Sequence, residues 1–518
     1  MAENSGFLER RIVIGLVVST DYISQVQPVW DSRYIQSATT RLLASWCLEY
    51  YESYQKAPGQ GIEGIYYAKL QAGAMSKELA EEIEEDILPG LSEEYEHDDH
   101  FNVQYLLDQT RQYFRTRHLQ LHSEEIQSLV DMGEIDEAES KAAGYSYSLQ
   151  IEQTGLDLSQ EIALTRVEQT FEKKEARVIA YPRALGELWN DQLSRDSLVA
   201  LMAPEKRGKT FWLLDMAIRA IRSKANVAFF QAGDMSEGQQ LRRICIHLAK
   251  KSDMAKYCGK VLMPVGDCVF NQNNTCDREE RECDFGVLDT YPLDPWEFRK
   301  QLNHDDLLQA WKEEPDYLPC RNCQSRIGSI WYKEEDTGPP LTGKEAKEQL
   351  RKFFANRKSR FKLSTHVNGT LSIEGIQAEL KFWEREDGFV PDVIVIDYAD
   401  LLTTKRKLEF RHQQDEIWRG LRGLSQERHC LVLTATQSDA KSYERDRLRL
   451  SNFSEDKRKY AHVTAMYGLN QDTRGQEKKM GLMRVNELVV REGEFHDANE
   501  VYVMQCLQRG KPFLGSFK

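Results

Sequence analysis

Hydrophobic positions recur with the period of an α-helix over the first part of the chain. The clearest stretches are residues 35–54 and 103–114, where apolar side chains return to one helical face. Clusters of glycine and proline at 59–61 and 89–90 separate these stretches as loops. This pattern predicts an all-α domain over residues 1–145, followed by a polar, helix-prone linker over 146–180. No catalytic constellation is visible before residue 145, so we expect this domain to act in packing or assembly.

From about residue 183, short apolar runs alternate with helical stretches. Such runs are typical of parallel strands that helices cover on both faces. The predicted strands are 198–202, 227–230, 361–365, 393–396 and 430–435, the predicted helices are 211–221, 239–250 and 417–427, and short β-rich segments at 463–469, 487–491 and 500–507 close the chain. The pattern therefore predicts an α/β domain with a mostly parallel sheet over residues 181–518, interrupted by an insertion at about 252–355.

Composition restricts the class of protein. Hydrophobic residues make up 41% and charged residues 29% of the 518 residues, as in soluble globular proteins. No apolar run approaches the ~20 residues that span a bilayer, and no small-residue cleavage site follows the short run at 12–18. We therefore expect a cytoplasmic protein without a membrane partner. The net charge of −14 argues against a uniformly basic nucleic-acid binder, although local basic loops can still hold single-stranded DNA.

A phosphate-binding loop lies between the first predicted strand and the first predicted helix of this domain. The sequence from position 203 is Ala-Pro-Glu-Lys-Arg-Gly-Lys-Thr, and backbone N–H groups of such a loop face phosphates. Lys209 would supply positive charge to the β- and γ-phosphates of ATP, and the Thr210 hydroxyl would hold Mg²⁺. Alanine replaces the usual first glycine, which is tolerated if φ stays negative there. The candidate nucleotide-binding residues are Ala203, Gly208, Lys209, Thr210 and Phe211, and a decayed loop that binds no nucleotide is the alternative.

Three polar side chains end other predicted strands of the same sheet. Asp397 follows the run Val-Ile-Val-Ile, and ligands of doubly wound sheets bind at the edge where the strands end. Asp397 is therefore a second candidate Mg²⁺ ligand, Asp234 a candidate for orienting the attacking water, and Gln437 a candidate sensor of the γ-phosphate. For Asp397 and Asp234, the alternative is that each only caps the helix that follows.

Together these segments resemble the DnaB-type replicative helicases of the RecA-like superfamily over most of the chain. One motif of that family is similar to Phe229-Phe230, Asp234-Met235-Ser236, Gln240-Leu241 and Arg243, with Asp234 where the family has glutamate. The segment 394–402 looks like the family's Walker B segment, and Thr436-Gln437 correspond to its Ser-Gln. The segment 506–512 resembles the family's Lys-x-Arg-Asn-Gly-Pro finger, with Leu507 at the lysine and Arg509 at the arginine.

The resemblance implies a function and a set of partners. It implies a RecA-like P-loop ATPase that assembles as a homohexameric ring, translocates on single-stranded DNA and unwinds duplex DNA in replication. Arg509 would be an arginine finger that reaches the ATP of the neighbouring subunit. A primase or a helicase loader would be a further partner, and a phage or prophage origin would suit so divergent a sequence.

Two other functions remain open. A RecA-like ATPase of recombination or loading would bind DNA without unwinding it and would share every nucleotide motif. A nucleotide-binding scaffold with little turnover would be consistent with Ala203, with Asp234 in place of glutamate, and with Leu507.

Two basic segments follow the Walker elements. In a ring of this type, such segments face the central channel and contact phosphates. Acidic residues are interleaved with them, so ordinary solvated charge is the alternative. The candidate DNA-binding residues are Lys405, Arg406, Lys407 and Arg411 in the first segment and Lys441, Arg445, Arg447 and Arg449 in the second.

Cysteines are concentrated in the insertion, where six of the ten lie between Cys258 and Cys323. In an intracellular protein, such clustering favours a metal over disulfides. We expect a tetrahedral structural Zn²⁺ site in a segment too polar to build its own core. The candidate ligands are Cys276, Cys283, Cys320 and Cys323, with Cys268 in reserve. Buried free thiols are the alternative, and the uneven spacing leaves the choice of four ligands open.

Overall fold

The computed structural model describes residues 2–72, 102–143, 177–273, 302–320, 328–404, 409–450, 457–491 and 498–518, with a few isolated positions between these ranges. The chain divides into two compact units, 1–174 with 384–388 and 175–383 with 389–518. Most of the predicted linker at 146–180 lies outside the described residues. In the described parts, no single helix is long and apolar enough to cross a membrane, and one bent pair, 6–18 with 20–29, passes that test by length and composition alone.

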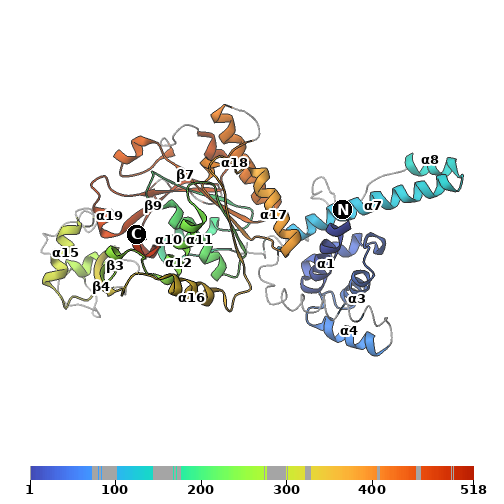
Figure 1. Cartoon of the computed structure of the whole chain (residues 1–518), viewed down its shortest axis with the longest axis horizontal. Coiled ribbons are helices and arrows are strands. Elements are labelled where there is room, and N and C mark those ends of the chain that lie inside the picture. Colours follow the sequence, from blue (N-terminus) through green and yellow to red (C-terminus); the bar gives the residue numbers. More distant parts are fainter. Residues whose placement is uncertain are drawn as a thin grey trace. The chain divides into compact units, whose positions relative to one another are not determined.

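The first unit is helical throughout its described ranges (Figure 1). Its α-helices are α1 (Ala2–Val18), α2 (Thr20–Val26), α3 (Ala38–Tyr54), α4 (Gly61–Gln71), α7 (Val103–Asp131) and α8 (Ile135–Ala143). Side-chain oxygens of Ser19 and Ser37 accept from backbone N–H groups at the starts of α2 and α3, which satisfies donors that helix ends leave free. Apolar residues of α1, α2, α3, α4 and α7 form one core, which includes Leu16, Trp46 and Phe114.

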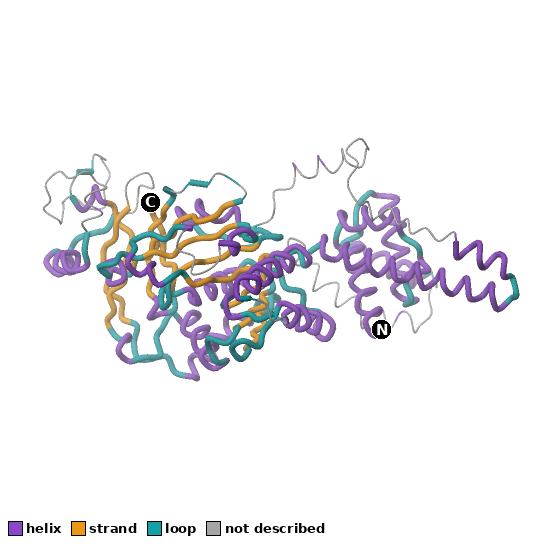
Figure 2. Tube along the Cα trace, turned by 90° about the horizontal axis from the view of Figure 1, so that it is seen from above, coloured by secondary structure: helices purple, strands orange, loops and turns teal. Residues whose placement is uncertain are grey.

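A nine-stranded sheet organises the described residues of the second unit (Figures 1 and 2). Its strands are β1 (Leu198–Ala203), β2 (Val227–Gln231), β5 (Phe361–Thr365), β6 (Val393–Asp397), β7 (Leu431–Gln437), β8 (Ala465–Asn470), β9 (Leu482–Val490), β10 (Glu500–Cys506) and β11 (Lys511–Phe517). Their order in the sheet is β11-β10-β9-β8-β1-β7-β6-β2-β5. The strands from β8 to β5 in this order are parallel to one another, whereas β9, β10 and β11 extend the sheet with antiparallel pairs. The predicted α/β fold with a mostly parallel sheet is therefore confirmed.

Helices cover both faces of this sheet (Figure 1). They are α10 (Arg183–Trp189), α11 (Lys209–Arg222), α16 (Gly343–Phe354), α17 (Ile373–Asp387) and α18 (Phe410–Glu427), and α12 (Glu237–Ala249) packs against α11 and α16. Alternate residues of β1 point to opposite layers, because successive side chains of a strand leave opposite faces. Val199 and Leu201 pack with α10 and α11, whereas Leu198 and Ala200 pack with α17 and α18.

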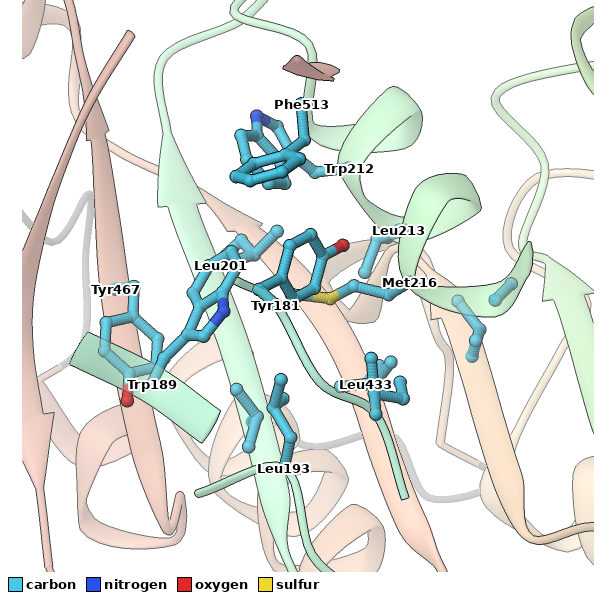
Figure 3. Packing of buried hydrophobic residues seen from close by; sticks show 14 of the residues in the cluster. Tyr181, Trp189, Leu193, Leu201, Trp212, Leu213, Met216, Leu433, Tyr467 and Phe513 are labelled. Carbon is cyan, nitrogen blue, oxygen red and sulfur yellow. The ribbon is translucent and has the colours of Figure 1, made fainter. Parts of the chain in front are cut away.

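Aromatic rings fill the layer between β1 and α11 (Figure 3). Trp189 meets Tyr181 and Tyr467 edge to face, with ring centroids 5.1 and 5.4 Å apart, and Trp212 of α11 lies 5.5 Å from it. Edge-to-face pairs of this kind add to the energy of area burial. The buried hydroxyl of Tyr181 donates to Asp215 at 2.7 Å. This layer fixes the position of α11, and therefore the position of the helix start that borders the phosphate loop.

The described part of the insertion contains a two-stranded antiparallel ribbon, β3 (Lys260–Cys268) with β4 (Gly328–Asp336), and the helices α13 (Val269–Gln272) and α15 (His304–Glu313). Ile330, Trp331 and Tyr332 of β4 are buried and pack with Leu307 of α15. The same cluster includes Met480 of α19 (Gln476–Met480), Leu482 and Met504. The segment was expected to be too polar to build its own core. Its described apolar residues, among them three consecutive residues of β4, instead share a core with the antiparallel end of the large sheet.

Candidate functional site

The phosphate loop joins the end of β1 to the start of α11. Ala203 is the last residue of β1 and keeps a negative φ, so alanine is accommodated at the position of the usual glycine. Gly208 has φ +87° and forms the N-cap of α11, a backbone conformation that residues with a Cβ adopt at a cost. The glycine therefore directs the N–H groups of the first helical turn towards the loop, which is the arrangement that binds anions.

Lys209 is folded into its own loop. Its ammonium donates to the carbonyl oxygens of Ala203 at 2.9 Å and Pro204 at 3.1 Å. Burial lowers the pKa of Lys209 to about 8, and the nearby carboxylates of Asp400 and Asp397 act in the opposite direction. Burial has removed most of the water that would stabilise this ammonium. An anionic ligand would therefore stabilise its charged form.

Asp397 is buried at the end of β6, beside the first turn of α11. The Thr210 hydroxyl lies 3.2 Å from its Oδ1, so the two predicted Mg²⁺ ligands are adjacent. Burial raises the pKa of Asp397 to about 6, although the Thr210 hydrogen bond lowers it. With its amide nitrogen turned to Asp397, Gln231 donates to Oδ2 at 2.9 Å and accepts from the N–H of Met235 at 3.2 Å. Sequence reasoning missed Gln231, although a buried amide ending a strand was the available signal.

Asp234 lies in the turn between β2 and α12 and is exposed. The cap of α12 is Ser236, which forms a reciprocal capping box with Gln239, so the structure gives Asp234 no capping role. Burial lowers the pKa of Arg243, and the negative charges of Asp397 and, to a smaller extent, Asp234 act in the opposite direction. The charge of Asp234 therefore reaches the site. The Arg243 guanidinium also lies 5.0 Å from the ring centroid of Phe211. Arg243 was noted only as part of a motif, and the structure adds it to the site as a cation facing both carboxylates.

Gln437 ends β7, the strand that lies between β1 and β6 in the sheet. Its side-chain Nε2 donates to the hydroxyl of Tyr398 at 2.7 Å, and its backbone N–H donates to Asp400 at 2.8 Å. Tyr398 is also close to the phosphate loop, since the Lys209 ammonium lies 5.8 Å from its ring centroid. The structure therefore places the amide of Gln437 one side chain away from Lys209.

Arg509 lies in the short turn η11 (Leu507–Arg509) between β10 and β11, where it contacts its own chain. Its Nη1 is 2.6 Å from Oε2 of Glu335 in β4, and its Nε donates to the carbonyl oxygen of Lys250 at 2.6 Å. A Cβ added to Gly208 would lie 3.1 Å from Cδ1 of Leu507, so this turn also covers the chain's own phosphate loop. The predicted role of Arg509 in a neighbouring subunit stays a prediction.

The candidate DNA-binding residues are only partly within the described residues. Lys405, Arg406 and Lys407 lie outside them, as does the side chain of Lys441. Arg411, Arg445 and Arg449 are exposed. Arg447 is half-buried, and its Nε lies 3.7 Å from Glu500. Arg411 and Arg445 therefore have the exposure that a phosphate contact requires, whereas Arg447 is turned towards a carboxylate of its own chain.

The cysteines of the insertion are also only partly described. Cys283 and Cys323 lie outside the described residues, Cys276 and Cys320 are half-buried, and Cys268 is buried. Within the described ranges, no group of three or more metal-binding side chains was found. Asp267 accepts from the backbone N–H groups of Cys268 and Cys320, both at 2.8 Å, and burial raises its pKa to about 6. Nothing in the local sequence indicated that this carboxylate joins two of the candidate ligand positions.

No protein-family model matches the chain, and no curated protein does. Among solved structures, the chain is similar to one described as an ATPase domain, at 14% identity and TM-score 0.44, covering 69% of this chain and 98% of the other. It is also similar to a DnaB-like replicative helicase, described with its interactions with primase, at 14% identity and TM-score 0.44, covering 98% of both chains.

Proposed function

We propose that the protein is an ATP-dependent DNA helicase that assembles as a ring, translocates on single-stranded DNA and unwinds duplex DNA. The observation that carries the proposal is the pairing of Thr210 with the buried Asp397 beside Lys209. These three groups come from two separate segments, and their convergence at one sheet edge supports a nucleotide site rather than a decayed loop. The helicase activity itself rests on the sequence resemblance described above.

The side chains have complementary tasks in this proposal. Lys209 and the N–H groups at the start of α11 bind the phosphates of ATP, and Thr210 and Asp397 supply the oxygen ligands that Mg²⁺ prefers. Mg²⁺ bound there would neutralise charge that develops on the phosphoryl group. Asp234 orients the attacking water, and Arg243 holds a positive charge between the two carboxylates. Arg411, Arg445 and the other basic residues of the two segments contact DNA phosphates.

The deciding experiment measures ATP hydrolysis with and without single-stranded DNA, followed by displacement of a labelled strand from a forked duplex. We expect DNA to stimulate turnover and ATP to drive strand displacement. Stimulated turnover without displacement would favour a recombination or loading ATPase. Nucleotide binding without turnover would favour a scaffold, for which aspartate at position 234 in place of glutamate is the supporting feature. Light scattering would test the expected hexamer.

Binding of Mg²⁺ is expected to weaken as the pH falls from 7 to 5. The pKa of Asp397 is raised to about 6 by burial, and a carboxylate must be ionised to coordinate a metal. Ionisation falls to about one tenth at pH 5, so the Mg²⁺ concentration for half-maximal binding of a fluorescent ATP analogue should rise about tenfold. An unchanged Mg²⁺ requirement across this range would contradict the assignment of Asp397.

We also propose a structural zinc site in the insertion, where the backbone N–H groups of Cys268 and Cys320 both donate to Asp267, so that two candidate ligand residues lie near each other. Elemental analysis of the purified protein should give about one zinc per chain, as a four-thiolate structural site requires. Cys320→Ser should lower the zinc content and the unfolding temperature, whereas the control Cys245→Ser on α12 should leave the zinc content unchanged. Absence of zinc from the unmodified protein would refute the site.

A further inference from the structure

A cluster of charged and polar side chains lies next to Gln437. It forms where the turn after β6, the end of β7 and the short helix before β8 meet. Asp400 comes from the turn η7 (Ala399–Leu401) after β6, Thr436 from the end of β7, and Lys459 from the short helix η10 (Lys457–Ala461). The Lys459 ammonium lies 2.7 Å from Oδ1 of Asp400, and its side chain is only 4% exposed. Sequence reasoning assigned no role to either residue.

Burial makes this ion pair unlike a surface salt bridge. The Asp400 side chain is 16% exposed, so both charges have lost most of their water. Such pairs are weak evidence for added stability, because the cost of desolvation offsets the attraction, but each partner is strongly dependent on the other. A function for the pair is therefore better sought in what Asp400 holds in place.

Asp400 fixes the end of β7 with both of its oxygens. The Thr436 hydroxyl lies 3.0 and 2.9 Å from the two carboxylate oxygens, and the N–H of Gln437 donates to Oδ2 at 2.8 Å. The side chain of Gln437 in turn donates to Tyr398, whose ring lies 5.8 Å from the Lys209 ammonium. A continuous set of contacts therefore runs from Lys459 to the phosphate loop.

Asp400 also acts on Lys209 through its charge. Asp400 follows the C-terminal end of β6 and Lys209 follows that of β1, so both charges lie at the same edge of the parallel sheet. A carboxylate so near the phosphate-binding lysine would repel a bound polyphosphate if no cation balanced it. Lys459 supplies this balance, so its position sets both the geometry of Gln437 and the net charge beside the phosphates.

We propose that Lys459 is a positioning residue that couples the basic segment 438–450, which follows β7, to the nucleotide site, with Asp400 as the intermediate. Arg445 and Arg449 lie in this segment, and η10 is the first described element after it. DNA held by the segment would then alter nucleotide affinity through the Lys459–Asp400 pair. The inference rests on the proposed function for the identity of the two ligands, ATP and single-stranded DNA.

The test measures the affinity of a fluorescent, non-hydrolysable ATP analogue with and without an oligo-dT strand. For the unmodified protein, DNA should change this affinity by about fivefold or more, the lower range of allosteric coupling. Lys459→Met should weaken DNA-free binding about tenfold and reduce the DNA effect to less than about twofold. Lys459→Met combined with Asp400→Asn removes both charges and should restore DNA-free binding to within about threefold, but not the DNA effect. The control is Lys347→Met on α16, where the lysine is exposed.

A normal DNA effect in Lys459→Met would overturn the coupling, and a double variant that binds as weakly as Lys459→Met would overturn the charge argument. If thermal unfolding shows that Lys459→Met does not fold, the double variant carries the test through its DNA effect. Nucleotide affinity of the unmodified protein that ignores DNA would refute the coupling, even if DNA still stimulates turnover. An intact DNA effect in a protein without turnover would refute the proposed enzyme and leave the coupling in place.

Discussion

Lys209→Ala is expected to lower the kcat for ATP hydrolysis by at least about 10²-fold without unfolding the second unit. The buried ammonium of Lys209 is held inside the phosphate loop, where it would contact the phosphates of ATP. Preorganised charges of this kind contribute about 10²–10³-fold to catalysis. The fold should persist because α11 is held by buried apolar residues such as Trp212 and Leu213, whose contacts do not involve Lys209.

The matched control for this variant is Lys224→Asn. Lys224 is exposed just beyond the opposite end of α11 and has φ +67°, and asparagine tolerates that left-handed backbone. Both variants should have unfolding temperatures close to that of the unmodified protein, and only Lys209→Ala should lose turnover. Hydrolysis by Lys209→Ala within about tenfold of normal would show that the loop is not the catalytic site.

The central strands and the residues that end them could be predicted from the sequence. β6 is a continuous apolar run whose C-terminal end is marked by its first polar residue, Asp397, and the buried strand β7 ends at Gln437 after an apolar stretch that contains two threonines. Because parallel strands end at one edge, the local pattern was sufficient to expect these side chains near Lys209.

Contacts between distant segments could not be predicted in this way. Nothing in the local sequence around Lys459 indicates that it is buried against Asp400, since a lysine in a polar stretch reads as solvated charge. The insertion was misinterpreted for a related reason. The apolar residues of β4 pack in one cluster with residues of α15, α19 and β10, and the last two elements are far away in sequence. The polar composition of the whole insertion hid a short strand in which three consecutive apolar residues are buried.

The insertion gives Arg509 a partner that the family resemblance did not imply. Glu335 at the end of β4 forms an ion pair with Arg509, and the side chain of the arginine is only 13% exposed. The carboxylate competes with any phosphate for the same guanidinium, because each is a preferred bidentate partner of arginine. In a ring, Arg509 would have to leave Glu335 before it could reach the nucleotide of a neighbouring subunit.

Arg509→Ala is expected to reduce kcat by about 10³-fold or more, the effect typical of an arginine finger, and to leave nucleotide affinity within about threefold of normal. Glu335→Gln is the matched control, since it breaks the same ion pair but keeps the guanidinium, and it should retain turnover. Mixing inactive Arg509→Ala chains with inactive Lys209→Ala chains before assembly should restore part of the activity. Some interfaces would then join an intact phosphate loop from one chain to an intact Arg509 from the other. No recovery in oligomers shown to be mixed, or an equal loss of binding and turnover in Arg509→Ala, would mean that Arg509 acts within its own chain, where it braces the turn against β4 and α12.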